Sequence, residues 1–282
     1  MEKDFTMIVT DILKKNNEDI TSDFLYHYTD GKSLQNIIEH SELWLSDRNY
    51  MNDILDEEYV SGLIKSKFAG IVNFKGSYIE RNLFEKIPQY IFSTSLEKDL
   101  IHQWSYYSST DAYCIEFDRH KLRDYLYQFK EKKDGFYFGP VIYSKEKAEQ
   151  IITQVMDDYK KLLLEIIDSR DFDPHRTKMK NTAKDVYQYF FSLIKQYGHY
   201  CEKEFRFVFK TNRDPCFRTR SGLFVPYIKI TKENVLLPIT KIIIGPNNHE
   251  QIALQSLKKF LEKNKYGNIV VERSELNVRE SK

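Results

Sequence analysis

The stretch Leu-Tyr-His-Tyr-Thr, residues 25–29, places one histidine in the middle of an aromatic and apolar run. Such a run predicts a buried strand, which we expect over residues 24–29. Two other stretches extend the pattern: Phe-Ser-Thr-Ser at residues 92–95, and Glu-Lys-Glu-Phe-Arg at residues 202–206. Each predicts a further strand. The order of the three, with a central His, a closing Ser-Thr-Ser and a Glu-x-Glu, is more informative than any one of them.

The composition of the 282-residue chain is that of a folded protein. Hydrophobic residues make up 41% and charged residues 30%, and 20 Tyr and 19 Phe supply many aromatic surfaces. We expect one domain over residues 1–282, since this length can bury a core without disulfides or metals. Lys and Arg (43) nearly balance Asp and Glu (42), so no global field would attract DNA, RNA or an anionic membrane.

Cysteine usage and the lack of a recognisable targeting signal predict a cytoplasmic protein. The three cysteines are an odd number without CxxC or Cys/His spacing, which indicates neither a zinc site nor a disulfide framework. The amino terminus lacks a basic start followed by an apolar run, and no segment has the apolar length of a membrane span, so we expect no membrane partner. The sequence contains no GxGxxG after a strand, P-loop, HExxH or GxSxG, which removes the commonest dehydrogenase, NTPase, zincin and hydrolase functions.

Periodicity places further elements along the chain. Strands are expected at residues 43–46, 90–95, 112–117, 205–209, 224–230, 239–244 and 269–271. Helices are expected at residues 4–16, 34–38, 102–107, 121–129, 145–168, 182–197 and 250–263, and one more runs through Tyr59. Ser33 is the expected cap of the helix at 34–38, and Gly139-Pro140 an expected hairpin-like turn. The long helices predict a helical insertion over residues 145–198, and the irregular order of helices and strands predicts an α+β fold.

Glu202 and Glu204 would lie on one face of a strand, because side chains alternate with a period of two. Arg206 extends that face and predicts an ion pair with Glu204. Two such acids suit metal binding or glycoside hydrolysis, and they also suit a solvated strand face. NAD cleavage makes a narrower demand: positive charge builds on the ribose as nicotinamide leaves, so an ionised carboxylate stabilises the transition state.

Polar and aromatic residues near the other two stretches have alternative interpretations. His27 is either a core histidine or a neutral imidazole that hydrogen-bonds a ribose hydroxyl. Ser93, Thr94 and Ser95 either form a turn or brace a cleft. Tyrosines can hold a nicotinamide ring, and Tyr28 and Tyr107 are the candidates, with core or lid packing as the alternative.

A basic cluster follows the Glu-x-Glu segment. It comprises Lys203, Arg206, Lys210, Arg213, Arg218, Arg220 and Lys229. These residues form either a solvated hairpin tip or a grip on phosphates. In the second case Arg206, Lys210, Arg213 and Arg218 would bind a macromolecular substrate beside the reacting ribose.

The residues resemble a known family. Those that carry the resemblance are the segment 25–29, residues 43–46, Asn52, Asp53, Phe92, Ser93, Trp104, Tyr107, residues 114–117, Glu202, Glu204 and Arg206. Together they are similar to the bacterial domain of unknown function 2971 family, over roughly residues 24–245. That family is in turn similar to the ADP-ribosyltransferase superfamily and occurs among toxin and phage-defence proteins.

The resemblance implies a split, mainly antiparallel sheet of ADP-ribosyltransferase type, with NAD as a substrate in its cleft. It implies that His27 and the Ser-Thr-Ser strand bind the dinucleotide, that Glu204 is catalytic and that Glu202 faces the target. Transferases with Ser-Thr-Ser usually carry Arg on the first strand, whereas this chain carries His27 there. A protein or nucleic-acid target is implied, with an antitoxin or defence-system protein as a further partner.

Three functions remain open from the sequence. The first is an NAD-dependent ADP-ribosyltransferase, and the second is a nucleotide- or protein-binding module of the same fold without catalysis. The third is a metal-dependent nuclease that uses Glu202 and Glu204 with Asp53 or Asp118. Divalent-metal dependence separates the third from the first, since NAD cleavage at such a site needs no metal.

Overall fold

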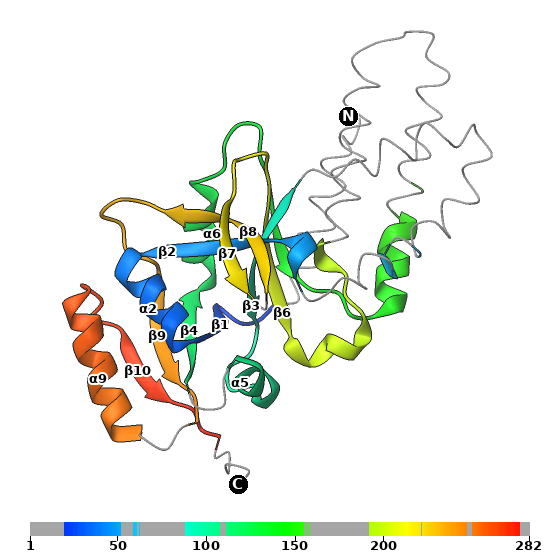
Figure 1. Cartoon of the computed structure of the whole chain (residues 1–282). Helices are drawn as coiled ribbons and strands as arrows, with labels where there is room; N and C mark the ends of the chain where they lie inside the picture. Colours follow the sequence, from blue (N-terminus) through cyan, green and yellow to red (C-terminus); the bar gives the residue numbers. More distant parts are fainter. Residues whose placement is uncertain are drawn as a thin grey trace.

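The computed structural model describes residues 20–51, 59, 60, 62, 88–107, 111–154, 157, 192–220, 222–246 and 250–276 (Figure 1). Within these ranges ten strands form one sheet. They are β1 (Phe24–Asp30), β2 (Glu42–Asp47), β3 (Gln89–Ser95), β4 (Ala112–Asp118), β5 (Gly135–Pro140), β6 (Glu204–Lys210), β7 (Cys216–Arg220), β8 (Leu223–Thr231), β9 (Ile239–Ile244) and β10 (Val270–Arg273). The helices are α2 (Gly31–His40), α5 (Ile101–Tyr107), α6 (Arg119–Tyr127) and α9 (Glu250–Lys263), with 3-10 turns η1 (Arg48–Tyr50) and η2 (Tyr197–Glu202).

The α+β class and the mainly antiparallel sheet are confirmed. Strands pair antiparallel except for β9 and β10, which are parallel and joined by α9. Two local predictions were wrong, and one strand was missed. Asp30, not Ser33, caps α2, because its carboxylate accepts the Ser33 N–H at 2.7 Å. Gly139 and Pro140 end β5 without a hairpin turn, and β7 was not predicted.

The strand β3 is the branch point of the sheet. Along one edge it pairs with β6 over its whole length. On its other edge β1 pairs at Ser95, opposite Tyr26, while β2 pairs at Tyr90 and Ile91. Between these contacts, at residues 92–94, that edge has no strand partner in the described part of the chain. The strands β1 and β2 therefore diverge, and they lead into a β1–β4–β9–β10 arm and a β2–β8–β7 arm.

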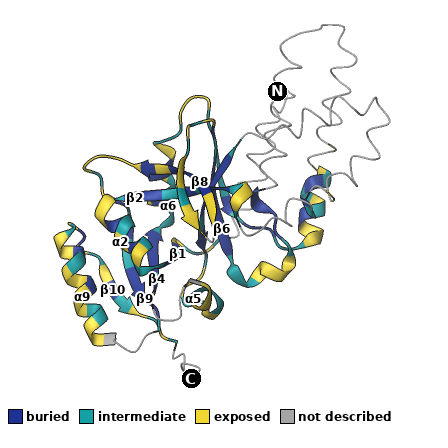
Figure 2. Ribbon diagram, viewed as in Figure 1, coloured by how far each residue is buried: buried dark blue, intermediate teal, exposed yellow. Residues whose placement is uncertain are grey.

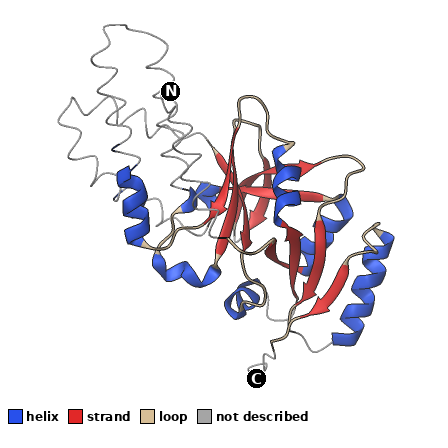
Figure 3. Cartoon of the chain, turned by 180° about the vertical axis from the view of Figure 1, so that it is seen from behind, coloured by secondary structure: helices blue, strands red, loops and turns tan. Residues whose placement is uncertain are grey.

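One face of the sheet carries the hydrophobic core. Alternate residues of β1, β2, β3, β4 and β6 point to it, including the fully buried Phe205, Phe207 and Phe209. Three helices, α2, α6 and α9, cover this face with leucine, isoleucine and tyrosine side chains (Figures 2 and 3). Burying each phenylalanine stabilises the fold by roughly 1.5–3 kcal/mol. The phenylalanines of β6 thus fix which face its polar residues, Glu204 and Arg206, must occupy.

The opposite face carries the polar residues of β3 and β6. The helix α5 packs there through Trp104 against Tyr28 and Cys114. Two chain segments also meet beside β6: Ile142 and Ile194 form a parallel bridge, and the Ile142 N–H donates to the Leu193 carbonyl at 2.7 Å. The predicted insertion at residues 145–198 therefore leaves and returns at neighbouring points.

Some sequence predictions lie outside the described residues: the helix at 4–16, Asn52, Asp53 and most of the insertion. In the described part of the chain, no helix combines the length and apolar character needed to cross a bilayer. The three cysteines are all free.

Candidate functional site

Glu204 begins β6 on the polar face of the sheet and is held by Arg206 two residues later. Arg206 Nε donates to Glu204 Oε1 and Nη2 donates to Oε2, each at 2.8 Å. Arg206 Nη1 donates to the Ser192 carbonyl at 2.9 Å. Both side chains are buried, so this two-point ion pair is of the strong, charge-assisted kind. The predicted pairing of Glu204 with Arg206 is confirmed, and the substrate role expected for Arg206 stays a prediction.

Lys195 joins the two glutamates. Its Nζ lies 2.7 Å from Glu202 Oε2 and 3.6 Å from Glu204 Oε2. His199 Nδ1 lies 3.0 Å from the other oxygen of Glu202. Sequence reasoning missed Lys195, because it precedes β6 and reaches Glu204 through the chain segment that returns beside Ile142. No local pattern marks such a partner.

The expectation that Glu202 and Glu204 share a strand face was wrong. Glu202 is the last residue of η2, and Lys203 adopts the left-handed conformation with φ 47°. Since side chains alternate only within a strand, this left-handed residue breaks the period of two before β6 begins. The two carboxylates converge on Lys195 nevertheless, through a different geometry.

Burial by itself would raise the pKa of Glu204, but the charges of Arg206 and then Lys195 outweigh it and lower the pKa to about 2. Glu204 is therefore ionised at neutral pH. Tyr143 also reaches this residue, since its hydroxyl accepts the Glu204 N–H at 3.0 Å. Burial raises the pKa of Tyr143 well above its ordinary value, so its hydroxyl stays neutral.

The Ser-Thr-Ser segment lies between β1 and β6. Thr94 Oγ1 donates to the Phe205 carbonyl at 2.8 Å, and Ser95 Oγ donates to the Glu202 carbonyl at 2.9 Å. These bonds fix the backbone on both sides of Glu204. The buried Ser93 Oγ lies close enough to the Glu204 carboxylate to help lower its pKa.

His27 lies where β1 and β2 diverge. Its Nδ1 is 2.9 Å from the Ser93 carbonyl, and its ring stacks on Phe92 with centroids 4.6 Å apart. A carbonyl can only accept, so Nδ1 carries the proton and Nε2 is left as an acceptor. Burial, aided by the charge of Arg218, lowers the pKa of His27 to about 4, against the opposing effect of the hydrogen bond that Nδ1 donates to the Ser93 carbonyl. The imidazole is therefore neutral at pH 7.

Tyr28 packs beneath α5. Its hydroxyl donates to the Glu97 carbonyl at 3.1 Å and accepts the Leu100 N–H at 2.9 Å, while Trp104 meets its ring edge-on at 4.9 Å. These contacts hold the loop after β3 in place. Tyr107 ends α5, and its side chain lies outside the described residues.

The basic residues do not gather beside Glu204 as expected. Lys210 ends β6, roughly 20 Å along the strand from Glu204 at about 3.3 Å per residue. Arg213 lies beyond it and pairs with Asp134 and with Glu131. Arg218 lies on β7 in the other arm, where its Nη2 donates to Ser46 Oγ at 2.7 Å. The expectation that one loop presents them together was therefore wrong, because β6 separates the first two from Glu204.

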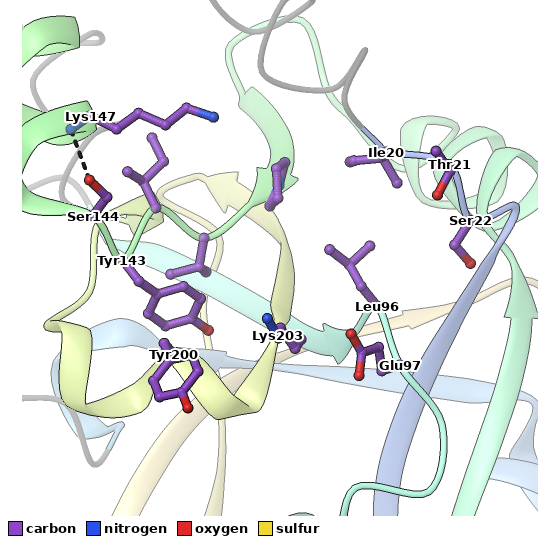
Figure 4. Close-up of a pocket in the computed structure, with 13 residues that line it drawn as sticks. Ile20, Thr21, Ser22, Leu96, Glu97, Tyr143, Ser144, Lys147, Tyr200 and Lys203 are labelled. Atoms are coloured by element: carbon purple, nitrogen blue, oxygen red, sulfur yellow. Dashed lines mark hydrogen bonds between the residues drawn. The ribbon is translucent and has the colours of Figure 1, made fainter.

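A pocket of about 550 Å³ is lined by Lys203, the residue between Glu202 and Glu204, among others (Figure 4). Its walls come from the residues before β1, the residues after β3 and β5, and η2: Ile20, Thr21, Ser22, Leu96, Glu97, Pro140, Val141, Ile142, Tyr143, Ser144, Lys147, Tyr200 and Lys203. Tyr143 connects it to Glu204 through the hydrogen bond to the Glu204 N–H. The volume is within the range of small-molecule sites, about 300–1,000 Å³.

Of the two aspartates considered as metal ligands, one caps a helix and the other lies outside the described residues. Asp118 caps α6, where its carboxylate accepts the Lys121 N–H at 2.9 Å. Asp53 lies outside the described residues. Within the described ranges, no group of three or more His, Cys, Asp or Glu side chains could hold one metal ion.

Residues 103–207 match the family described as "Protein of unknown function (DUF2971)". The matched region runs from α5 into β6 and includes Glu202, Glu204 and Arg206. It supports the resemblance to that family over this part of the chain. No curated protein and no solved structure matches the chain.

Proposed function

We propose that the chain is an NAD-dependent, ADP-ribosyltransferase-like protein that modifies a macromolecule, in a toxin or phage-defence role. The observation that carries the proposal is the position of β3. This strand bears Ser-Thr-Ser and runs between the start of β6, with Glu204, and β1, with His27. Three segments far apart in sequence thus meet at the place where the sheet divides.

The protonation states suit NAD cleavage. Neutral His27 offers Nε2 as an acceptor for a ribose hydroxyl. Ionised Glu204 would stabilise the positive charge that builds on the ribose as the bond from C1′ to the nicotinamide nitrogen breaks. For this, Lys195 or Arg206 must release part of the carboxylate, since both now hold it.

That last condition favours a second candidate, a nucleotide-binding module without catalysis. A carboxylate that two buried cations already neutralise stabilises a third positive charge weakly. In this case Glu204 would serve to order β6 and the segment around Ser192, and the split in the sheet would bind a nucleotide without cleaving it.

NAD binding and nicotinamide release separate the two candidates. Calorimetry with a non-hydrolysable NAD analogue measures binding, and chromatography after incubation with NAD and a cell lysate measures release. Binding with release supports the transferase, binding without release supports the module, and no binding contradicts both. Release that persists in EDTA is expected for the transferase.

Two variants test the residue roles. Glu204→Gln should lower release by about 100-fold or more, as expected for the loss of one electrostatic stabiliser. The matched control is Glu116→Gln, since Glu116 is an equally buried acid on β4, where Thr240 and Lys241 hold it. Glu202→Gln should impair transfer to the target more than NAD hydrolysis. Equal release from Glu204→Gln and wild type, with both proteins folded by circular dichroism, would show that Glu204 is not catalytic.

A further inference from the structure

The short helix η2, immediately before Glu204, exposes a pair of stacked tyrosines. Tyr197 and Tyr200 lie with ring centroids 5.0 Å apart and planes 10° from parallel. They are 66% and 46% exposed, so neither ring is part of the core. A stacked, solvent-facing pair is costly to leave without a partner, because apolar ring surface is left in water.

Lys203 adds a positive charge to this pair. Its ammonium lies 5.6 Å from the centre of the Tyr200 ring, and it makes no ion pair within the described ranges. Its left-handed backbone is uncommon for a residue with a side chain and costs on the order of 1 kcal/mol or more. Hydrogen bonds from Leu96 N–H to its carbonyl, at 2.8 Å, and from its own N–H to the Tyr200 carbonyl, at 3.3 Å, hold it there.

Tyr200 and Lys203 both line the pocket beside Glu204, whereas Tyr197 does not (Figure 4). Tyr197 stacks on the ring of Tyr200, and Tyr200 lines the pocket. Tyr143, drawn next to Tyr200 in Figure 4, accepts the Glu204 N–H with its hydroxyl. A planar group stacked on Tyr200 would thus lie in the same pocket as Tyr143, whose hydroxyl accepts the Glu204 N–H.

We propose that Tyr200, backed by Tyr197, stacks a base of a single-stranded nucleic acid in this pocket, and that Lys203 contacts an adjacent phosphate. Every base has a π-face, and aromatic side chains with a nearby cation are the common platform for single strands. The chain's formal charge of +1 excludes a long electrostatic track, so the contact covers one base and one or two phosphates. Duplex DNA would not fit, because its bases are already stacked.

The binding does not depend on catalysis by Glu204. Its link to ADP-ribosyl transfer rests on the proposed function, for which it names the acceptor as a single-stranded nucleic acid. The two can fail separately, because base stacking is measured without NAD and nicotinamide release without an oligonucleotide.

Fluorescence anisotropy tests the proposal with labelled single strands of DNA and RNA of about 12 nucleotides, and with a hairpin duplex as the competing ligand. Tyr200→Leu should weaken single-strand binding about 5- to 150-fold, the range for loss of one stacked base. Tyr200→Phe should bind as wild type, and Tyr197→Leu should lose less than Tyr200→Leu. Tyr127→Leu is the matched control, since Tyr127 is a 59% exposed tyrosine on α6.

Salt dependence gives a second, independent readout. For single strands the logarithm of the affinity falls with the logarithm of salt by about 0.7 per phosphate contacted, so a slope between about −0.7 and −1.4 is expected. Lys203→Ala should reduce the slope by about 0.7, whereas Lys258→Ala on α9 should not change it. Duplex binding as tight as single-strand binding, or a Tyr200→Leu affinity within twofold of wild type, would overturn the proposal.

Discussion

Lys195 and Glu204 provide the sharpest test of the buried charge cluster. Their charged atoms lie 3.6 Å apart, and the two side chains are 4% and 8% exposed. At that distance, with an effective dielectric constant of about 20, the Coulomb attraction is roughly 4–5 kcal/mol before desolvation. Measured couplings between contacting residues are about 0.5–3 kcal/mol, and we expect about 2 kcal/mol here.

The measurement is a double-mutant cycle from urea unfolding at pH 7, with Lys195→Met, Glu204→Gln and the double variant. Glu204→Gln alone should cost about 3–5 kcal/mol, because it leaves Arg206 and Lys195 buried without their shared anion. Lys195→Met should cost less, since Glu202 is 25% exposed and can turn to water. The double variant should lose about 2 kcal/mol less than the sum.

The pair Lys98 and Glu275 is the control for this cycle. Its atoms are closer, at 3.3 Å, but the side chains are 41% and 80% exposed. Surface pairs couple by about 0–1 kcal/mol, so burial rather than distance should decide the result. A Lys195–Glu204 coupling below about 0.5 kcal/mol, or one no larger than that of the control, would refute the reasoning.

Further predictions concern the other described contacts. Arg213→Ala should lower the melting temperature, because Arg213 pairs with Asp134 and Glu131, but should leave nicotinamide release unchanged; a selective loss of release would restore its substrate role. His27→Phe keeps the stack on Phe92 but leaves the Ser93 carbonyl unpaired, which should cost about 1–3 kcal/mol in urea unfolding; an unchanged midpoint would mean that the 2.9 Å contact contributes nothing. Folding lowers the pKa of His27 to about 4 and that of Glu204 to about 2. As the pH falls, the unfolded chain therefore binds protons before the folded chain does. Stability should fall between about pH 6.5 and 4 because of His27, and between about pH 4.5 and 2 because of Glu204. In acid titrations of stability, His27→Phe should lose the fall above pH 4 and Glu204→Gln the fall below about pH 4.5. Loss of both falls from one variant would contradict the assignment. Lys203→Gly should relieve the left-handed strain and leave stability within about 1 kcal/mol of wild type while weakening oligonucleotide binding; a larger loss of stability would assign Lys203 a structural role.

Local patterns predicted most of the sheet. The strands β1, β3 and β9 are apolar runs bounded by turn residues, and the helix predicted at residues 250–263 is α9. The strand β7 escaped because Cys216–Arg220 is short, exposed and basic, and its strand conformation comes from pairing with β8. Propensity is a weak guide where one neighbouring strand supplies all the hydrogen bonds.

The site was predictable only in part: Glu204 and Arg206 were predicted to pair, whereas Lys195 and Tyr143 were missed. The Glu204–Arg206 pair follows from strand alternation, since both residues lie within β6. The position of Glu202 does not, because a single left-handed residue, Lys203, reorients the chain before the strand begins. His27 packs on Phe92, and its Nδ1 reaches the Ser93 carbonyl on β3, whereas its hydrogen bond to a ribose hydroxyl stays a prediction.

The branching of the sheet at β3 has a mechanical consequence. One arm is attached to this strand at a single register position and the other at two, so the arms are held together mainly by the shared hydrophobic core and by α2. The strands β3 and β6 pair at seven register positions, so this pairing is more rigid than the attachments of β3 to β1 and β2. A ligand that contacts His27 on one arm and Arg218 on the other would therefore link the two arms, and it should slow hydrogen exchange in both.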